Sequence, residues 1–279
     1  MTLFLLRAYG DFVIAVNMVS RSLFREKIML VASKHLEPLY QVIEPLLPFP
    51  VQIRFVDFKL DKQLMRCFTN RYLFHPHTLT ELSALRKYLR AEKITGTAYL
   101  EKQNRIYFPR FFCHHPFRSI VSHGPVYQSY ADFFSVHLHT LEEIPFEKKK
   151  HHSNILIVPD SRQAIKVIDK GIIQKIQDHY TSASVSVTIA FFRKAWDSVT
   201  GNVVVYHNFN ELIQLIQATD LLIGGDSLPV HLAQLLNTPH LIVYPGSKTQ
   251  DFFTPFALKN RCFFTFEAIR NNPSFLTDV

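Results

Sequence analysis

Residues 221–236, LLIGGDSLPVHLAQLL, pass from an apolar run into two glycines, an acid and a hydroxyl, and then into apolar residues at helical spacing. Glycine permits a sharp turn with positive φ and lets a ligand approach the backbone closely. Asp226 and Ser227 begin the expected helix, and Pro229 falls in its first turn, where a missing amide hydrogen costs little. The unpaired amides of that turn and the Ser227 hydroxyl predict an anion-binding site. An ordinary capped helix is the alternative.

A second polar turn, VPDSRQAIK at residues 158–166, also leads from a predicted strand to a predicted helix. Ser161 is placed to cap that helix, and Arg162 and Lys166 bring positive charge to its start. The helix dipole opposes cations at this end, so their presence is easier to explain if a phosphate group binds there. A solvated basic surface is the alternative.

Gly10 and Asp11 follow the first apolar run and precede an apolar helix. Asp11 is interpreted in two ways: as the N-cap of this helix, or as a carboxylate held at the tip of the first strand and facing a cleft. The local pattern alone does not choose between them.

The usual cofactor and metal motifs are missing from the sequence: there is no GxGxxG, no P-loop, no HExxH and no paired CxxC. The adjacent histidines at 114–115 and 151–152 are poorly spaced to share one metal ion, so no metal is expected. The three cysteines are odd in number and widely spaced, which favours reduced thiols in a cytoplasm: Cys67, Cys113 and Cys262.

From residue 154 onward, short β-branched runs alternate with helical spacing, which predicts a parallel sheet covered by helices. Such sheets bind ligands at the carboxyl ends of their strands. The predicted strands are 155–158, 184–192, 203–207, 221–225 and 240–244, and the predicted helices are 164–180, 208–220 and 229–237.

The N-terminal half is less regular. It predicts a strand, a loop and a helix over 3–23, strands at 27–33 and 51–58, and an amphipathic helix at 78–93, with no clear pattern beyond Gly96. The charged segment 142–154 is predicted to be a linker. We therefore expect two domains, 1–150 and 151–279.

Charge is distributed unequally between these domains. Residues 1–150 carry 21 basic and 13 acidic side chains, whereas residues 151–279 carry 10 of each, so the whole net charge of +8 lies in the first domain. Such a field favours an anionic partner: phosphorylated lipid, a membrane surface or nucleic acid. No apolar stretch reaches the roughly 20 residues that span a bilayer, and no signal peptide is evident, so a soluble or peripheral protein is expected.

Taken in order, these stretches resemble glycosyltransferase family 9, the lipopolysaccharide heptosyltransferase group. The family signature Asp-Ser/Thr-Gly-Pro-x-His-Leu-Ala corresponds to DSLPVHLA at 226–233. The family's Gly-Asp loop corresponds to Gly10 and Asp11, and its Pro-Gly-Ala/Ser loop followed by a lysine corresponds to 159–161 and Lys166.

Three positions depart from the family pattern. Leu228 replaces the glycine of the signature, and Asp160 replaces the glycine of the lysine loop. An acid that commonly follows the second strand of the donor domain has its nearest candidate in Asp197.

The resemblance implies an α/β fold of the GT-B type, with two Rossmann-like, doubly wound domains facing each other across a cleft. Domain 1–150 would bind the acceptor and domain 151–279 the nucleotide sugar. The implied enzyme is an inverting, metal-independent glycosyltransferase without a cofactor, whose donor is a nucleotide-diphosphate sugar such as ADP-heptose.

The implied acceptor is an anionic glycolipid, a lipopolysaccharide or lipooligosaccharide core or another surface glycan. This places the protein in the cytoplasm, in peripheral contact with the inner face of the inner membrane. Nucleic acid is not expected as a partner.

The resemblance also implies roles for individual residues. Asp11 would be the general base that removes a proton from the acceptor hydroxyl. Lys166, Ser227 and the amides near 226–229 would stabilise the leaving diphosphate. The implied donor-binding residues are Ser161, Lys166, Asp226, Ser227, Leu228 and His231.

Two other classes of function are weighed against this one. A non-catalytic GT-B module would bind a nucleotide or glycolipid as an assembly partner. A nucleic-acid-binding protein would use the basic and aromatic side chains of 54–118, but that segment contains no recognised module.

Overall fold

The computed structural model describes residues 2–5, 9–56, 97–101, 117–121, 153–162, 164–182, 184–246 and 263–272, and the single positions 127, 131 and 136. The chain divides into two compact units: unit 1 comprises 1–124 and 128–136, and unit 2 comprises 125–127 and 137–279. Unit 2 therefore takes in residues that were assigned to the first domain. One reason is Tyr127, which is fully buried with its ring centroid 6.2 Å from that of His231.

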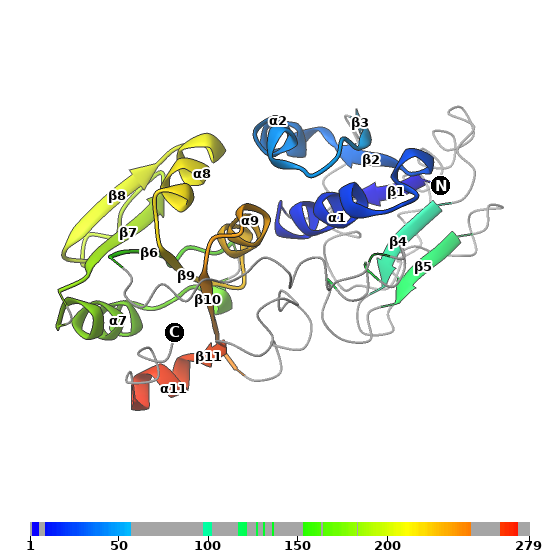
Figure 1. The fold of residues 1–279 in the computed structure, drawn as a ribbon. Coiled ribbons are helices and arrows are strands. Elements are labelled where there is room, and N and C mark those ends of the chain that lie inside the picture. The colour runs from blue at the N-terminus through cyan, green and yellow to red at the C-terminus, as the bar shows by residue number, and fades with distance from the viewer. Residues whose placement is uncertain are drawn as a thin grey trace, which may run out of the picture. The chain divides into compact units, whose positions relative to one another are not determined.

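Unit 1 contains a five-stranded parallel sheet in the order β3-β2-β1-β4-β5 (Figure 1). The first three strands confirm those predicted from the sequence. The last two lie beyond Gly96, where no element was predicted, and the helix predicted at 78–93 lies outside the described residues. The strands are β1 Thr2–Leu5, β2 Met29–Ser33, β3 Gln52–Val56, β4 Thr97–Glu101 and β5 Phe117–Val121.

The helices of unit 1 follow its first two strands. Helix α1 spans Tyr9–Arg21, and its residues 12–20 are all buried; all are apolar except Asn17 and Ser20. Helix α2 spans Glu37–Ile43 and has Pro38 in its first turn, where proline is tolerated. Three 3-10 turns complete the described part: η1 Arg25–Lys27, η2 Lys34–Leu36 and η3 Glu44–Leu46.

Unit 2 contains a six-stranded parallel sheet in the order β8-β7-β6-β9-β10-β11. Counted from the first strand of the unit, this order is the 3-2-1-4-5-6 arrangement of Rossmann folds. The first five strands confirm the predicted ones within two residues, while β11 was not predicted. The strands are β6 Asn154–Val158, β7 Ser186–Phe192, β8 Asn202–Tyr206, β9 Leu221–Gly225, β10 His240–Tyr244 and β11 Phe263–Thr265.

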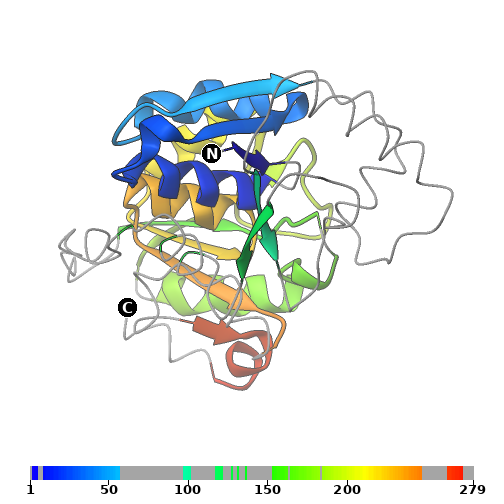
Figure 2. The same ribbon diagram turned by 90° about the vertical axis from the view of Figure 1, so that its right-hand side faces the viewer.

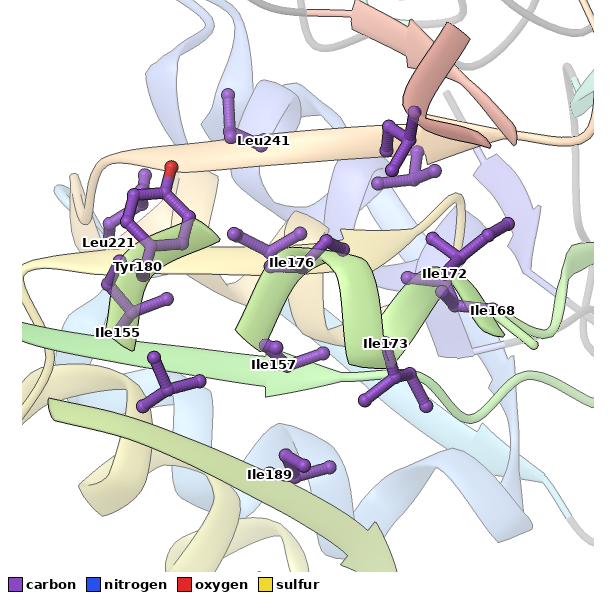
Figure 3. Close-up of a cluster of buried hydrophobic side chains, with 14 of the residues drawn as sticks. Ile155, Ile157, Ile168, Ile172, Ile173, Ile176, Tyr180, Ile189, Leu221 and Leu241 are labelled. Carbon is purple, nitrogen blue, oxygen red and sulfur yellow. The ribbon is translucent and has the colours of Figure 1, made fainter. Parts of the chain in front are cut away.

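Helices cover both faces of this sheet. Helices α7 (Lys170–Ser182) and α11 (Phe266–Asn271) pack together on one face, and α8 (Phe209–Gln217) and α9 (Leu228–Leu236) pack together on the other (Figures 1 and 2). Figure 3 shows how the isoleucines of α7 pack against those of β6 and β7. Burial of these apolar side chains stabilises the unit. None of the described helices has the length and apolar character needed to cross a membrane.

Helix α7 begins later than predicted. Residues 164–166 form a 3-10 turn, η6 Ala164–Lys166, and the helix starts only at Lys170. The cause is Asp169, whose Oδ1 accepts a hydrogen bond from the Ile172 amide at 3.0 Å, as an N-cap side chain does. Ser161 is therefore not the cap of α7, and that prediction was wrong.

The other helix ends follow known capping rules. Asn208 caps α8 through a 3.0 Å hydrogen bond from the Glu211 amide, and the Glu211 carboxylate accepts in return from the His207 amide. Helix α9 ends at Asn237, which adopts a left-handed conformation with φ of 57°.

Gly225 ends β9 where the backbone that follows β6 comes very close. A Cβ atom added to Gly225 would lie 2.4 Å from the carbonyl oxygen of Lys166, closer than two such atoms can approach. Neither Gly224 nor Gly225 has positive φ, so the sharp turn inferred from the sequence is not the reason for the pair. At Gly225, glycine is required because another part of the backbone needs the space of the side chain.

The Asp169 cap provides a first prediction. Replacing Asp169 by alanine removes the cap and should lower the free energy of unfolding by about 1 kcal/mol, measured by urea denaturation. Asp169→Asn is the matched control, because it keeps a side-chain acceptor for the helix while removing the charge that pairs with Arg270. Equal stability of Asp169→Ala and the wild type would contradict the assignment.

Stability should also depend on pH through Asp169. Burial raises the pKa of this carboxyl, but the Arg270 guanidinium and the Ile172 and Gly171 amides outweigh burial and lower the pKa below its usual range. The contribution is therefore present above the unfolded pKa of about 3.9 and is lost as the pH falls through the lower folded pKa. Asp169→Asn should not show this loss.

Gly225→Ala should destabilise unit 2 by about 1–3 kcal/mol, because the new methyl group displaces the Lys166 carbonyl. Gly246→Ala is the matched control, since a Cβ atom there meets nothing within 4 Å. Thermal unfolding of both variants measures the difference. If the two substitutions cost the same, close packing is not what requires Gly225.

Candidate functional site

The two sequence motifs of unit 2 meet at the centre of its sheet. Strands β6 and β9 are hydrogen-bonded neighbours, with Val158 opposite Gly224. The chain leaving β6 continues to α7 on one face, and the chain leaving β9 continues to α9 on the other. Their carboxyl ends therefore form a topological switch point, the place where open α/β sheets bind ligands.

An ion pair joins the two motifs at this point. The Lys166 Nζ atom lies 2.5 Å from Oδ2 of Asp226. The Asp226 side chain is only 2% exposed and the Lys166 side chain is 12% exposed. The carboxylate is thus enclosed by protein, whereas part of the lysine remains accessible to solvent.

His231 lies behind this pair on α9. Its Nε2 is 3.6 Å from Oδ1 of Asp226, and its side chain is 4% exposed. Within the described part of the chain, its Nδ1 atom is buried without a hydrogen-bond partner. Asp226 and His231 are therefore placed to position Lys166 rather than to meet solvent.

Ser227 occupies the N-cap position of α9, but its side chain makes no capping hydrogen bond to the helix. Its hydroxyl is 3.3 Å from the carbonyl oxygen of Gly225 and 3.4 Å from that of Asp160. It thus links the two strand ends. The Ser227 side chain thus does not satisfy the first amides of α9, which include that of the partly exposed Leu228, and such amides attract anions.

The Asp160 carboxylate is bound by the neighbouring strand β7. Its Oδ2 accepts a hydrogen bond from the Phe192 amide, 2.8 Å away at the end of β7. Burial raises the pKa of the carboxyl, and the hydrogen bond partly offsets this effect. Its charge also adds to burial in raising the pKa of Tyr206. The acid therefore joins β6 to β7.

The remaining predicted residues are less closely grouped. Ser161 is half-buried in the loop after Asp160. Asp11 is half-buried in the first turn of α1 in unit 1, where it is the third helical residue and not the N-cap. Whether Asp11 faces the residues of unit 2 stays a prediction. Asp197, the candidate for the acid after β7, is exposed.

Sequence reasoning missed two contacts that shape the site: the Lys166 carbonyl against Gly225, and the Asp160 carboxylate with the Phe192 amide. No sequence pattern near these residues predicts either contact. Among the described residues, no group of three or more His, Cys, Asp or Glu side chains could hold a metal ion. The histidine pairs at 114–115 and 151–152 lie outside the described residues.

Comparison with known proteins agrees with this architecture. Two solved structures from Escherichia coli have a TM-score of 0.59 to this chain. The ADP-heptose lipopolysaccharide heptosyltransferase II is 13% identical, and the match covers 99% of this chain and 96% of that one. The heptosyltransferase WaaC with ADP is 10% identical, and the match covers 99% of both chains. A family 9 glycosyltransferase from Veillonella parvula has a TM-score of 0.54 at 11% identity, covering 95% of this chain and 85% of that one. These likenesses confirm the GT-B type of α/β fold.

The family comparison covers much of unit 2. Residues 175–275 match the model of glycosyltransferase family 9 (heptosyltransferase), a range that includes α9 and its flanking strands. No curated protein sequence matches the chain significantly. The motif resemblance, the family match over residues 175–275 and the fold point the same way: the C-terminal part of the chain is similar to glycosyltransferase family 9, and the whole chain shares the fold of solved heptosyltransferases.

Proposed function

We propose that the protein is a family 9 glycosyltransferase that moves heptose or a related sugar from a nucleotide-diphosphate donor to an anionic glycolipid, with inversion and without a metal ion. The observation that carries the proposal is the Lys166–Asp226 pair at the switch point between β6 and β9. A lysine side chain that is partly accessible, beside a helix start that Ser227 does not cap, is suited to a diphosphate.

In this proposal the donor diphosphate binds to Lys166, the Ser227 hydroxyl and the first amides of α9. The similar E. coli protein WaaC was solved with ADP, which supports a nucleoside diphosphate as the ligand. Asp226 and His231, which are nearly inaccessible, hold the lysine in place. Ser161 and Leu228 line the approach from the two motifs.

Asp11 is proposed as the general base. The positive end of the α1 dipole stabilises a carboxylate in the first turn. The Asp11 carboxylate takes the proton of the acceptor hydroxyl as that oxygen bonds to the anomeric carbon. The bond from the same carbon to the diphosphate breaks with inversion, and the departing negative charge is stabilised by Lys166 and the helix amides.

The acceptor is proposed to bind unit 1, because residues 1–150 carry the whole net positive charge. An anionic core glycolipid on the inner face of the inner membrane matches this field. The protein would then work in the cytoplasm in peripheral contact with that surface.

Lys166→Ala should weaken the binding of a nucleoside diphosphate by about 10- to 100-fold, measured by calorimetry with a panel of bases, because a charge-assisted hydrogen bond is lost. Lys166→Ala also leaves Asp226 buried and unpaired, so the double variant Lys166→Ala/Asp226→Asn separates ligand binding from stability. Lys170→Ala, an exposed lysine four residues on, is the control. Unchanged affinity in the folded double variant would rule out the proposed diphosphate site.

Asp11→Asn should reduce sugar transfer by about 10²- to 10⁴-fold while donor binding is unchanged, because amides cannot act as general bases. Release of nucleoside diphosphate from ADP-heptose, in the presence of truncated lipopolysaccharide core, measures turnover. Glu37→Gln, an acid in the first turn of α2, is the matched control. A fully active Asp11→Asn protein would instead favour a non-catalytic binding module.

A further inference from the structure

We infer that a patch of apolar and cationic side chains on unit 1 docks the protein onto an anionic lipid surface. The patch consists of Leu23, Phe24, Arg25, Lys27 and Phe49. The inference rests on the proposed function, because a glycolipid acceptor requires the protein to contact a membrane. It adds the part of the protein surface that makes this contact. The basic and aromatic residues 105–116 lie outside the described part of the chain.

Exposed apolar side chains are concentrated in this region. Of the seven large apolar residues that are exposed in the described part of the chain, four lie between residues 23 and 49. Leu23 is 79% exposed, Phe24 is 51% exposed and Phe49 is 48% exposed. Single exposed apolar residues are common, but several gathered together indicate a binding surface.

Contacts show that the patch is continuous. The turn 22–28 follows α1, and the guanidinium of its Arg25 lies 4.4 Å from the ring centroid of Phe49. The Gln52 side chain, at the start of β3, donates a 3.1 Å hydrogen bond to the carbonyl oxygen of Glu26. Two loops that are distant in sequence thus form one surface at the amino ends of β2 and β3.

The backbone holds these side chains outward. Phe49 stands between Pro48 and Pro50, which restrict the loop to extended conformations. In the turn, the amide of Phe24 donates to the Ser22 hydroxyl at 3.1 Å, and the amide of Lys27 donates to the Phe24 carbonyl at 2.8 Å. The two loops therefore hold the apolar side chains exposed, and these loops lose little conformational entropy when the patch binds a surface.

The charges beside these side chains favour an anionic lipid surface over a neutral apolar partner. Within the patch, Arg25 and Lys27 outnumber Glu26, the acid between them. In a bilayer interface, Leu and Phe enter the boundary between headgroups and acyl chains, while Arg and Lys contact the anionic headgroups. Both kinds of group are present here side by side.

The patch is separate from the proposed chemistry. Asp11 lies in the first turn of α1 and Arg21 in its last, so about 15 Å of helix lies between them. Substitutions in the patch can therefore change membrane binding without touching the proposed base.

The test is cosedimentation of the full chain with vesicles of phosphatidylethanolamine and phosphatidylglycerol, compared with vesicles of phosphatidylcholine alone. We expect the wild type to partition into the anionic vesicles at low salt. Leu23→Ser/Phe24→Ser should lower the partition coefficient at least about tenfold. Arg25→Gln should lower it about fivefold, an effect that high salt removes.

Matched controls come from unit 2. Ile165→Ser removes an apolar side chain that is 69% exposed, and Lys170→Gln removes an exposed cation. Both should partition like the wild type. Thermal unfolding verifies that every variant is folded, and calorimetry with nucleoside diphosphates reports separately on the proposed function.

Three results would overturn the inference: no retention of the wild type by anionic vesicles, unchanged retention of Leu23→Ser/Phe24→Ser, or equal losses in the unit 2 controls. A wild type that dimerises, and whose dimer dissociates in Leu23→Ser/Phe24→Ser without any vesicle binding, would assign the patch to a second copy of the chain instead. Loss of nucleotide binding with intact vesicle retention would refute only the proposed function.

Discussion

The approach of the Lys166 backbone to Gly225 is the constraint on which the arrangement of unit 2 depends. The carbonyl oxygen of Lys166 occupies the space that any other side chain would fill at the end of β9. This contact closes the loop after β6 over the neighbouring strand end, so that the lysine side chain reaches Asp226. Two motifs separated by about 60 residues become one site because a single position lacks a side chain.

The ion pair has a consequence for stability as well as for chemistry. A carboxylate as enclosed as that of Asp226 is costly unless a cation compensates it. Lys166 supplies that compensation while part of its side chain stays accessible to solvent. His231 approaches the other carboxylate oxygen, and His240 nearby does not add charge, because burial lowers its pKa to about 4. The buried groups thus favour one position of the lysine.

Much of unit 2 could be predicted from its sequence, because its elements follow local rules. The strands appear as β-branched runs, and Asn208, one of the two asparagines that the sequence offers as a cap for α8, occupies the N-cap position. The start of α7 was misplaced because apolar spacing continues through 164–169, whereas Asp169 stops the helix from extending back. In unit 1 the apolar strands near the N-terminus were predicted, but β4 and β5 carry no clear alternation.

The candidate site was predicted as a set of residues but not as a geometry. Motif order identified Lys166, Asp226 and His231 as belonging together, and the structure of unit 2 brings them together. Their burial could not be predicted, because it depends on contacts between distant parts of the chain. The Gly225 and Asp160 contacts are of the same kind: each joins the loop that follows β6 to a strand distant in sequence.

The hydrogen bond to Asp160 has a wider consequence for judging sequences that depart from the motifs of an enzyme family. An acid in place of a motif glycine is readily interpreted as damage to a phosphate loop. Here the neighbouring strand β7 supplies an amide that donates a hydrogen bond to the acid, so the carboxylate is held at the carboxyl end of the strands. Loss of a motif glycine is therefore not enough to classify a relative as a pseudoenzyme, since the neighbouring strand can bind the side chain that replaces the glycine.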